Sequence, residues 1–108
     1  MSLDLPKPIA AYFAADKGDA DAIAECFAEQ AVVKDERKTY SGRAAIRQWK
    51  ADASAKYNNT SEPVDVANKD GKTVVTSRLV GNFPGSPIDL RYFFVIEGDR
   101  IASLEIIA

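Results

Sequence analysis

The chain has 108 residues, of which 46% are hydrophobic and 28% are charged. These values are ordinary for a globular protein and exclude a wholly disordered chain, and the length leaves room for a single domain over residues 1–108. Fourteen basic and sixteen acidic side chains give a net charge of −2, without the run of Lys or Arg that marks a nucleic-acid surface. The chain has no histidine, which excludes Ser-His-Asp and Cys-His nucleophile arrangements and imidazole metal sites.

The N-terminal residues and the cysteine usage favour a cytoplasmic protein. The segment from Met1 to Pro6 lacks the basic and apolar regions of a signal peptide. No apolar stretch approaches the ~20 residues that a membrane-spanning helix needs. The single cysteine, Cys26, cannot form an internal disulfide, which fits a reducing compartment.

Helical spacing of apolar residues predicts three helices in the first half of the chain. Pro6 and Pro8 suit the first turn of one helix, and Asp19 is the expected N-cap of the next. A third helix is expected after Ser41, and residues 58–63 break it. The apolar faces consist of Ile9, Tyr12 and Phe13 in the first helix, Ile23, Cys26 and Phe27 in the second, and Ile46, Trp49 and Ala53 in the third. The solvent side of the third helix is expected to carry Arg43, Arg47 and Lys50.

Strand patterns dominate the rest of the chain. Residues 31–33 form a short apolar run that ends near Asp35, and the polar residues 37–42 predict a turn. Asp70-Gly71 is a hairpin signal. Further strands are expected at residues 64–67, 73–82, 88–96 and 101–107. Because the helices come first and hairpin-linked strands follow, the pattern predicts an α+β domain.

Four phrases of the sequence resemble the NTF2-like superfamily, and within it the SnoaL-like and ketosteroid isomerase-like proteins. They are residues 12–19 (YFAADKGD), 27–35 (FAEQAVVKD), 41–46 (SGRAAI) and 86–89 (SPID), whose order and spacing span almost the whole chain. The resemblance implies a cystatin-like cone, in which three N-terminal helices pack on a curved, mainly antiparallel sheet around an apolar small-molecule pocket. It also implies a homodimer formed through the outer face of the sheet.

Three residues match the catalytic pattern of the isomerase-like members. Tyr12 matches the first-helix tyrosine that donates to a developing oxyanion, Asp35 matches the carboxylate base, and Asp89 matches the carboxylic acid that joins the tyrosine. The resemblance therefore implies proton transfer next to a carbonyl group of a small apolar ligand, without a cofactor or a metal. Without the resemblance, Tyr12 is a core residue of its helix and Asp35 is a solvated turn carboxylate.

The strand expected at residues 88–96 has two faces of similar composition. Alternation puts Asp89, Arg91, Phe93 and Val95 on one face and Ile88, Leu90, Tyr92, Phe94 and Ile96 on the other, so composition leaves open which face is concave. The resemblance places the face of Asp89 inside. The ligand contacts expected with this orientation are Arg91, Trp49, Phe93, Leu104 and Ile106, of which Trp49 and Phe93 are otherwise core residues.

Other residues depart from the isomerase pattern. The steroid-handling members carry an apolar residue where this chain has Arg91. An Arg91 paired with Asp89 would keep that carboxylate ionised, so that it could not donate a hydrogen bond to an oxyanion. Lys50 stands where some isomerases have a supporting tyrosine, and the link at residues 81–87 is shorter. These departures favour an alternative, in which the domain is a non-catalytic ligand-binding or dimerisation module with a salt-bridged Asp89.

Overall fold

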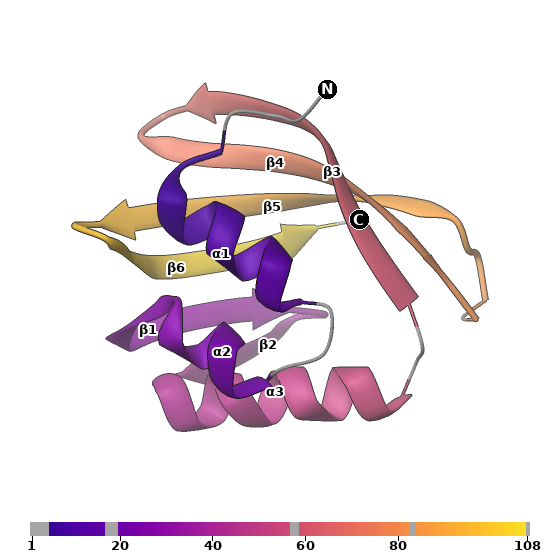
Figure 1. The fold of residues 1–108 in the computed structure, drawn as a ribbon, viewed down its shortest axis with the longest axis horizontal. Coiled ribbons are helices and arrows are strands. Elements are labelled where there is room, and N and C mark those ends of the chain that lie inside the picture. The colour runs from indigo at the N-terminus through magenta and orange to yellow at the C-terminus, as the bar shows by residue number, and fades with distance from the viewer. Residues whose placement is uncertain (1–4, 17–19, 57–58, 83, 108) are drawn as a thin grey trace.

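The computed structural model describes residues 5–16, 20–56, 59–82 and 84–107, whose arrangement is shown in Figure 1. The helices are α1 (Lys7–Ala15), α2 (Ala20–Glu25) and α3 (Arg43–Lys56), and the strands are β1 (Phe27–Asp35), β2 (Lys38–Ser41), β3 (Asn59–Lys69), β4 (Lys72–Gly81), β5 (Ile88–Glu97) and β6 (Arg100–Ile107). None of the described helices is long and apolar enough to cross a membrane. The N-cap expected at Asp19 lies outside the described residues.

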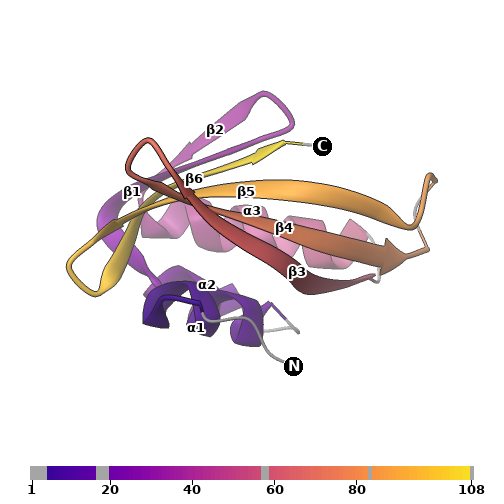
Figure 2. The same ribbon diagram turned by 90° about the horizontal axis from the view of Figure 1, so that it is seen from above.

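The strands form one sheet in the order β2-β1-β6-β5-β4-β3. Strands β1 and β6 run parallel, and the other neighbouring pairs are antiparallel. The sheet is bent, with α1 and α2 on its inner side (Figure 2), while α3 runs along β1 and β2 (Figure 1). The structure therefore confirms the α+β fold of three helices on a curved, mainly antiparallel sheet.

Strand β2 replaces part of the polar turn that the sequence predicts at residues 37–42. Asp35 pairs with Lys38 across a two-residue loop, in which Glu36 and Arg37 have φ angles of 52° and 66°. Two positive φ angles give a hairpin loop the twist that suits its strands, but Asn and Gly are the usual residues there. The hairpin therefore carries no ordinary sequence signal.

Two strands also begin earlier than the sequence predicts. Strand β1 begins at Phe27, which was expected in the second helix, and β3 begins at Asn59 within the stretch 58–63 that was expected to be irregular. Phe27 pairs with Ile101 of β6, and Asn59 pairs with Gly81 of β4. Pairing with strands distant in the sequence extends both elements, which local propensity does not register.

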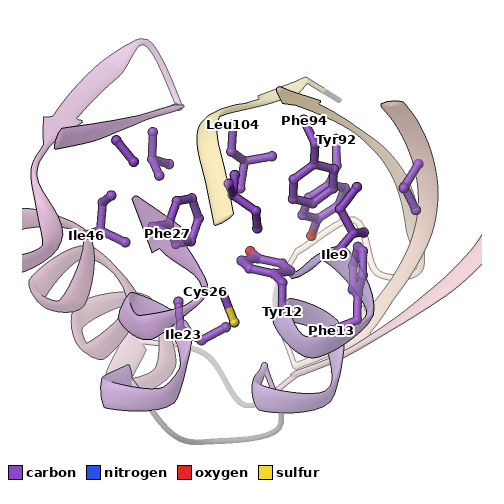
Figure 3. Close-up of a cluster of buried hydrophobic side chains, with 14 of the residues drawn as sticks. Ile9, Tyr12, Phe13, Ile23, Cys26, Phe27, Ile46, Tyr92, Phe94 and Leu104 are labelled. Atoms are coloured by element: carbon purple, nitrogen blue, oxygen red, sulfur yellow. The ribbon is translucent and has the colours of Figure 1, made fainter. Parts of the chain in front are cut away.

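The hydrophobic core fills the space between the helices and the inner face of the sheet (Figure 3). Both ends of the chain contribute to it, because α1 contacts β6 and its Tyr12 and Phe13 rings pack against Phe94 and Tyr92 of β5. Side chains less than 2% exposed in this core are Ile9, Tyr12, Ile23, Phe27, Ala31, Val33, Ile46, Val75, Phe94, Ile101 and Leu104. The core thereby fixes which side chains of the sheet face inward.

Candidate functional site

Asp35 ends strand β1 beside helix α3. The Nε1–H of Trp49 donates a hydrogen bond to Oδ2 of Asp35 over 3.0 Å. Burial raises the pKa of the half-buried Asp35 carboxyl group and the charge of Glu36 raises it further, while hydrogen bonds from Trp49 and from the backbone N–H of Glu36 oppose the rise. A desolvated and oriented carboxylate of this kind is suited to proton transfer. The structure thus brings two of the expected site residues together.

Tyr12 lies on the inner side of α1, where it is 1% exposed. Its ring packs edge-on against Phe13 and Phe94, at centroid distances of 5.1 and 5.6 Å. Burial raises the pKa of the Tyr12 phenol well above its usual value, and the neighbouring Tyr92 and Asp35 raise it further. Tyr12 therefore keeps its proton and remains a hydrogen-bond donor within electrostatic reach of Asp35.

Tyr92 on β5 is a polar residue of the inner face that the sequence prediction missed. It is 4% exposed, and its ring centroid lies 6.2 Å from that of Tyr12. Burial raises the pKa of the Tyr92 phenol, whereas a hydrogen bond with Ser61 lowers it and the charge of Asp35 raises it. Ser61 in turn lies 2.5 Å from Ser77, Oγ to Oγ. The signal that could have found Tyr92 is its place on the apolar face of its strand.

Asp89 and Arg91 lie on the outer face of the sheet, so the expectation that they face the pocket is wrong. Asp89 accepts a hydrogen bond from Nε of Arg78, which is directly opposite on β4, over 3.2 Å. The two side chains are 50% and 57% exposed. The core takes the face that carries Tyr92 and Phe94, and alternation then turns Asp89 outward. The expected salt bridge of Asp89 exists, but with a different arginine and outside the site.

The other expected ligand contacts divide between the two faces. Leu104 is 1% exposed in the core, and Ile106 packs against that core next to Asp35 in the β1–β6 register. Phe93 is half-buried on the outer face with Arg91, so its expected place in the pocket is wrong. Of these expected contacts, only Leu104 and Ile106 share the inner face of the sheet with Asp35.

Lys50 does not belong to the solvent side of α3, where the sequence placed it with Arg47. Its Nζ pairs with the carboxylate of Asp16 after α1, and the two side chains are 14% and 9% exposed. Burial lowers the pKa of Lys50 to about 8, while contact with Asp16 favours the charged ammonium, so the pair is intact at neutral pH. Arg47 by contrast is exposed and pairs with the exposed Asp21.

Two surface hollows have linings that include neither Asp35 nor Tyr12. A hollow of about 300 Å³ is lined by Leu5, Pro6, Val66, Ala67, Asn68 and Thr73. Another of about 360 Å³ is lined by Lys7, Pro8, Ala11, Ala15, Ala22, Glu25, Cys26, Asp99 and Arg100. Across the described part of the chain, no group of three His, Cys, Asp or Glu side chains could hold a metal ion. An enclosed pocket at Asp35 stays a prediction.

Comparisons with known proteins bear on the family and the fold of the chain. A family model described as a SnoaL-like domain matches residues 9–104. The chain is 41% identical to a Sinorhizobium meliloti protein named "putative polyketide cyclase (protein SMa1630)", over 99% of each chain and with a TM-score of 0.93. No curated protein matches the chain.

Two further solved structures resemble the chain less closely. The epoxide hydrolase/cyclase-like enzyme SalBIII, which has a role in pyran ring formation in salinomycin, is 27% identical over 92% of this chain and 85% of its own, with a TM-score of 0.75. A protein from Catenulispora acidiphila with a ketosteroid isomerase-like fold is 21% identical over 97% of this chain and 87% of its own, with a TM-score of 0.84. The resemblance expected from the sequence is confirmed at the level of family and fold.

Proposed function

Because this chain belongs to the SnoaL-like domain family, we propose that it is an enzyme that moves a proton next to a carbonyl group of a small, uncharged ligand. Asp35 is the base, and Tyr12 donates a hydrogen bond to the oxygen on which negative charge develops. The observation that carries this proposal is the half-buried Asp35 carboxylate, oriented by Trp49 and within electrostatic reach of a buried phenol.

The environment of Asp35 suits a base. Desolvation raises the proton affinity of its carboxylate, and the hydrogen bond from Trp49 fixes one oxygen. The Asp35 carboxylate is then the group that takes the proton from carbon. Acid–base catalysis is most effective when the pKa of the group lies near the working pH, and burial moves Asp35 in that direction.

The environment of Tyr12 suits a donor. Removal of a proton beside a carbonyl places negative charge on the carbonyl oxygen, and a fixed donor in a dry surrounding stabilises that charge strongly. Tyr12 is 1% exposed and surrounded by aromatic rings. Since Asp35 and Tyr12 supply both the base and the donor, the proposed reaction needs no cofactor.

The charges near the site favour an uncharged ligand. Lys50, the ammonium group buried near Trp49, is already paired with Asp16. The polar groups that the sheet adds are hydroxyls, from Tyr92, Ser61 and Ser77. The name of the similar Sinorhizobium meliloti protein supports carbonyl chemistry, because an aldol ring closure of a polyketide begins with the same proton removal.

The alternative is a non-catalytic ligand-binding or dimerisation module. The tight packing of Tyr12 in the core favours it, since such a tyrosine also serves as a core residue. Val80 and Ile107 on the outer face are 47% and 39% exposed, which supports a homodimer through this face under either function. A cytoplasmic location, expected from the lone Cys26, is part of the same proposal.

The test is proton exchange at carbon. A small β,γ-unsaturated cyclic ketone reports isomerisation by ultraviolet absorbance, and deuterium exchange of its α-protons is followed by NMR. We expect exchange above the buffer rate in the wild type and a loss of about 10²- to 10⁴-fold in Asp35→Asn. Asp89→Asn, which changes a carboxylate on the outer face, should keep the wild-type rate. Equal rates in wild type and Asp35→Asn would overturn the assignment of the base.

A further inference from the structure

A chain of three hydroxyl groups crosses the inner face of strands β3, β4 and β5. Ser77 is 0% exposed, and its Oγ lies 2.5 Å from Oγ of Ser61. Ser61 is hydrogen-bonded to the phenol of Tyr92. The neighbouring inward positions of β4 and β5 carry Val75 and Phe94, so these hydroxyls stand among apolar side chains. Burying polar groups in such a place is costly unless they bond to one another.

The sheet register brings the three residues together. Ser77 of β4 pairs with Pro63 of β3, two residues from Ser61, so the two serines are diagonal neighbours. The β3–β4 register shifts between Pro63 and Asp65, which makes Val64 an extra residue. The extra residue shifts the alternation of inward and outward side chains along β3, and before the bulge this alternation places Ser61 on the inner face.

The phenol of Tyr92 lies close to the proposed reacting groups. Tyr92 and Asp35 both pair with Ile106, one from each side, so their backbones are two strand spacings, or about 10 Å, apart. The ring centroids of Tyr92 and Tyr12 are 6.2 Å apart. Figure 3 shows both phenolic oxygens directed into the space between α1 and the inner face of the sheet.

The direction of the hydrogen bonds decides what Tyr92 can do. Each of the three hydroxyls has one proton. If Ser77 donates to Ser61 and Ser61 donates to Tyr92, the phenolic proton of Tyr92 is left for a ligand. Successive bonds in one direction polarise one another, which strengthens the last donor.

We infer that Tyr92 is a second hydrogen-bond donor to the developing oxyanion, and that Ser61 and Ser77 are positioning residues that hold its oxygen and leave its proton free. This inference rests on the proposed function, in which Tyr12 is the first donor. It assigns to a phenol of the inner face the part that the sequence resemblance gave to Asp89.

The experiment measures binding of 4-nitrophenolate, an oxyanion mimic followed by its absorbance, to Asp35→Asn protein. 4-Nitroanisole, in which the phenolate oxygen carries a methyl group in place of the charge, is the neutral probe. We expect Tyr92→Phe to weaken phenolate binding about 10- to 100-fold and Ser61→Ala to weaken it less, with recovery in Ser61→Thr. Binding of 4-nitroanisole should change less than twofold. Ser103→Ala, which removes a serine on the outer face, is the control.

Each outcome bears on one claim. If phenolate does not bind, or if Tyr12→Phe leaves its binding unchanged, the proposed function itself fails. If Tyr12→Phe weakens binding but Tyr92→Phe does not, the inference fails and the proposed function stands. If the variants weaken both probes equally, Tyr92 is a structural residue and the inference is overturned. The Ser61→Ala and Ser61→Thr pair decides the positioning role even if Tyr92→Phe does not fold.

Discussion

The two faces of strand β5 differ more in their surroundings than in their composition. On the inner face, Tyr92 and Phe94 are 4% and 0% exposed and belong to the core. On the outer face, the side chain of Asp89 is 50% exposed and lies beside Arg78. A carboxylate on the outer face interacts mainly with water and a neighbouring cation, whereas a phenol on the inner face has lost its water. The face of the strand therefore determines which polar group can act chemically.

Two ion pairs differ in their exposure in the same way. The side chains of Lys50 and Asp16, at the junction of α1 and α3, are 14% and 9% exposed. Those of Arg78 and Asp89, on the outer face of the sheet, are 57% and 50% exposed. Water screens the second pair and barely reaches the first. We therefore expect substitutions of buried residues to change the free energy of unfolding more than substitutions on the outer face.

The largest contrast is expected between Phe94→Ala and Phe93→Ala. Phe94 is 0% exposed and stacks on Tyr92 at a centroid distance of 6.1 Å, so its truncation leaves a cavity. The loss in unfolding free energy should be about 3–5 kcal/mol. Phe93 is half-buried on the outer face and should lose only about 1 kcal/mol. Urea denaturation measures both, and equal losses would contradict the assignment of the inner face.

The next largest effect is expected at the Lys50–Asp16 pair. Lys50→Met leaves the Asp16 carboxylate buried without its cation and should cost about 3 kcal/mol at pH 7. Lys50→Met combined with Asp16→Leu removes both charges and should recover most of the loss. A double variant as unstable as the single one would show that the charge is not the cause.

A smaller effect is expected from Asp35→Asn. The raised pKa of Asp35 means that the folded state binds more protons than the unfolded state just above pH 3.8, so the wild type loses stability as the pH rises through the folded-state pKa. Asn keeps the acceptor for Trp49 without the charge, and the variant should be more stable than wild type at pH 7 but not at pH 3. Thermal melts measure this, and exposed Asp65→Asn is the control that should show no gain.

The smallest effect is expected on the outer face. Arg78→Ala and Asp89→Ala should each change the unfolding free energy by less than about 1 kcal/mol, because the pair is well exposed. Added salt should shrink the difference further. A loss comparable to that of Lys50→Met would contradict the assignment of this pair to a solvent-exposed part of the outer face.

The order of elements could be predicted from the sequence because its signals are local. Apolar residues at helical spacing gave the three helices, and Asp70-Gly71 gave the β3–β4 turn, where both residues have positive φ angles of 53° and 77°. The β1–β2 turn is built the same way from Glu36 and Arg37, which seldom adopt that conformation, so β2 went unseen.

Part of the candidate site could also be predicted. The positions of Tyr12 and Asp35 follow from phrases that resemble the family, and the structure places both on the inner side. Asp89 and Arg91 were oriented wrongly, because alternation yields two faces and carries no information on which of them meets the helices.

The sequence by itself therefore determined the fold class and the positions of Tyr12 and Asp35 in the first helix and at the end of the first strand. The tertiary structure decided the rest: the inward turn of Tyr92, its link to Ser61 and Ser77 on two other strands, and the pairing of Lys50 with a carboxylate 34 residues away. The physical reason is that these contacts join elements distant in the chain. They depend on which face of each element loses its water, and that is settled only when the helices and the sheet pack together.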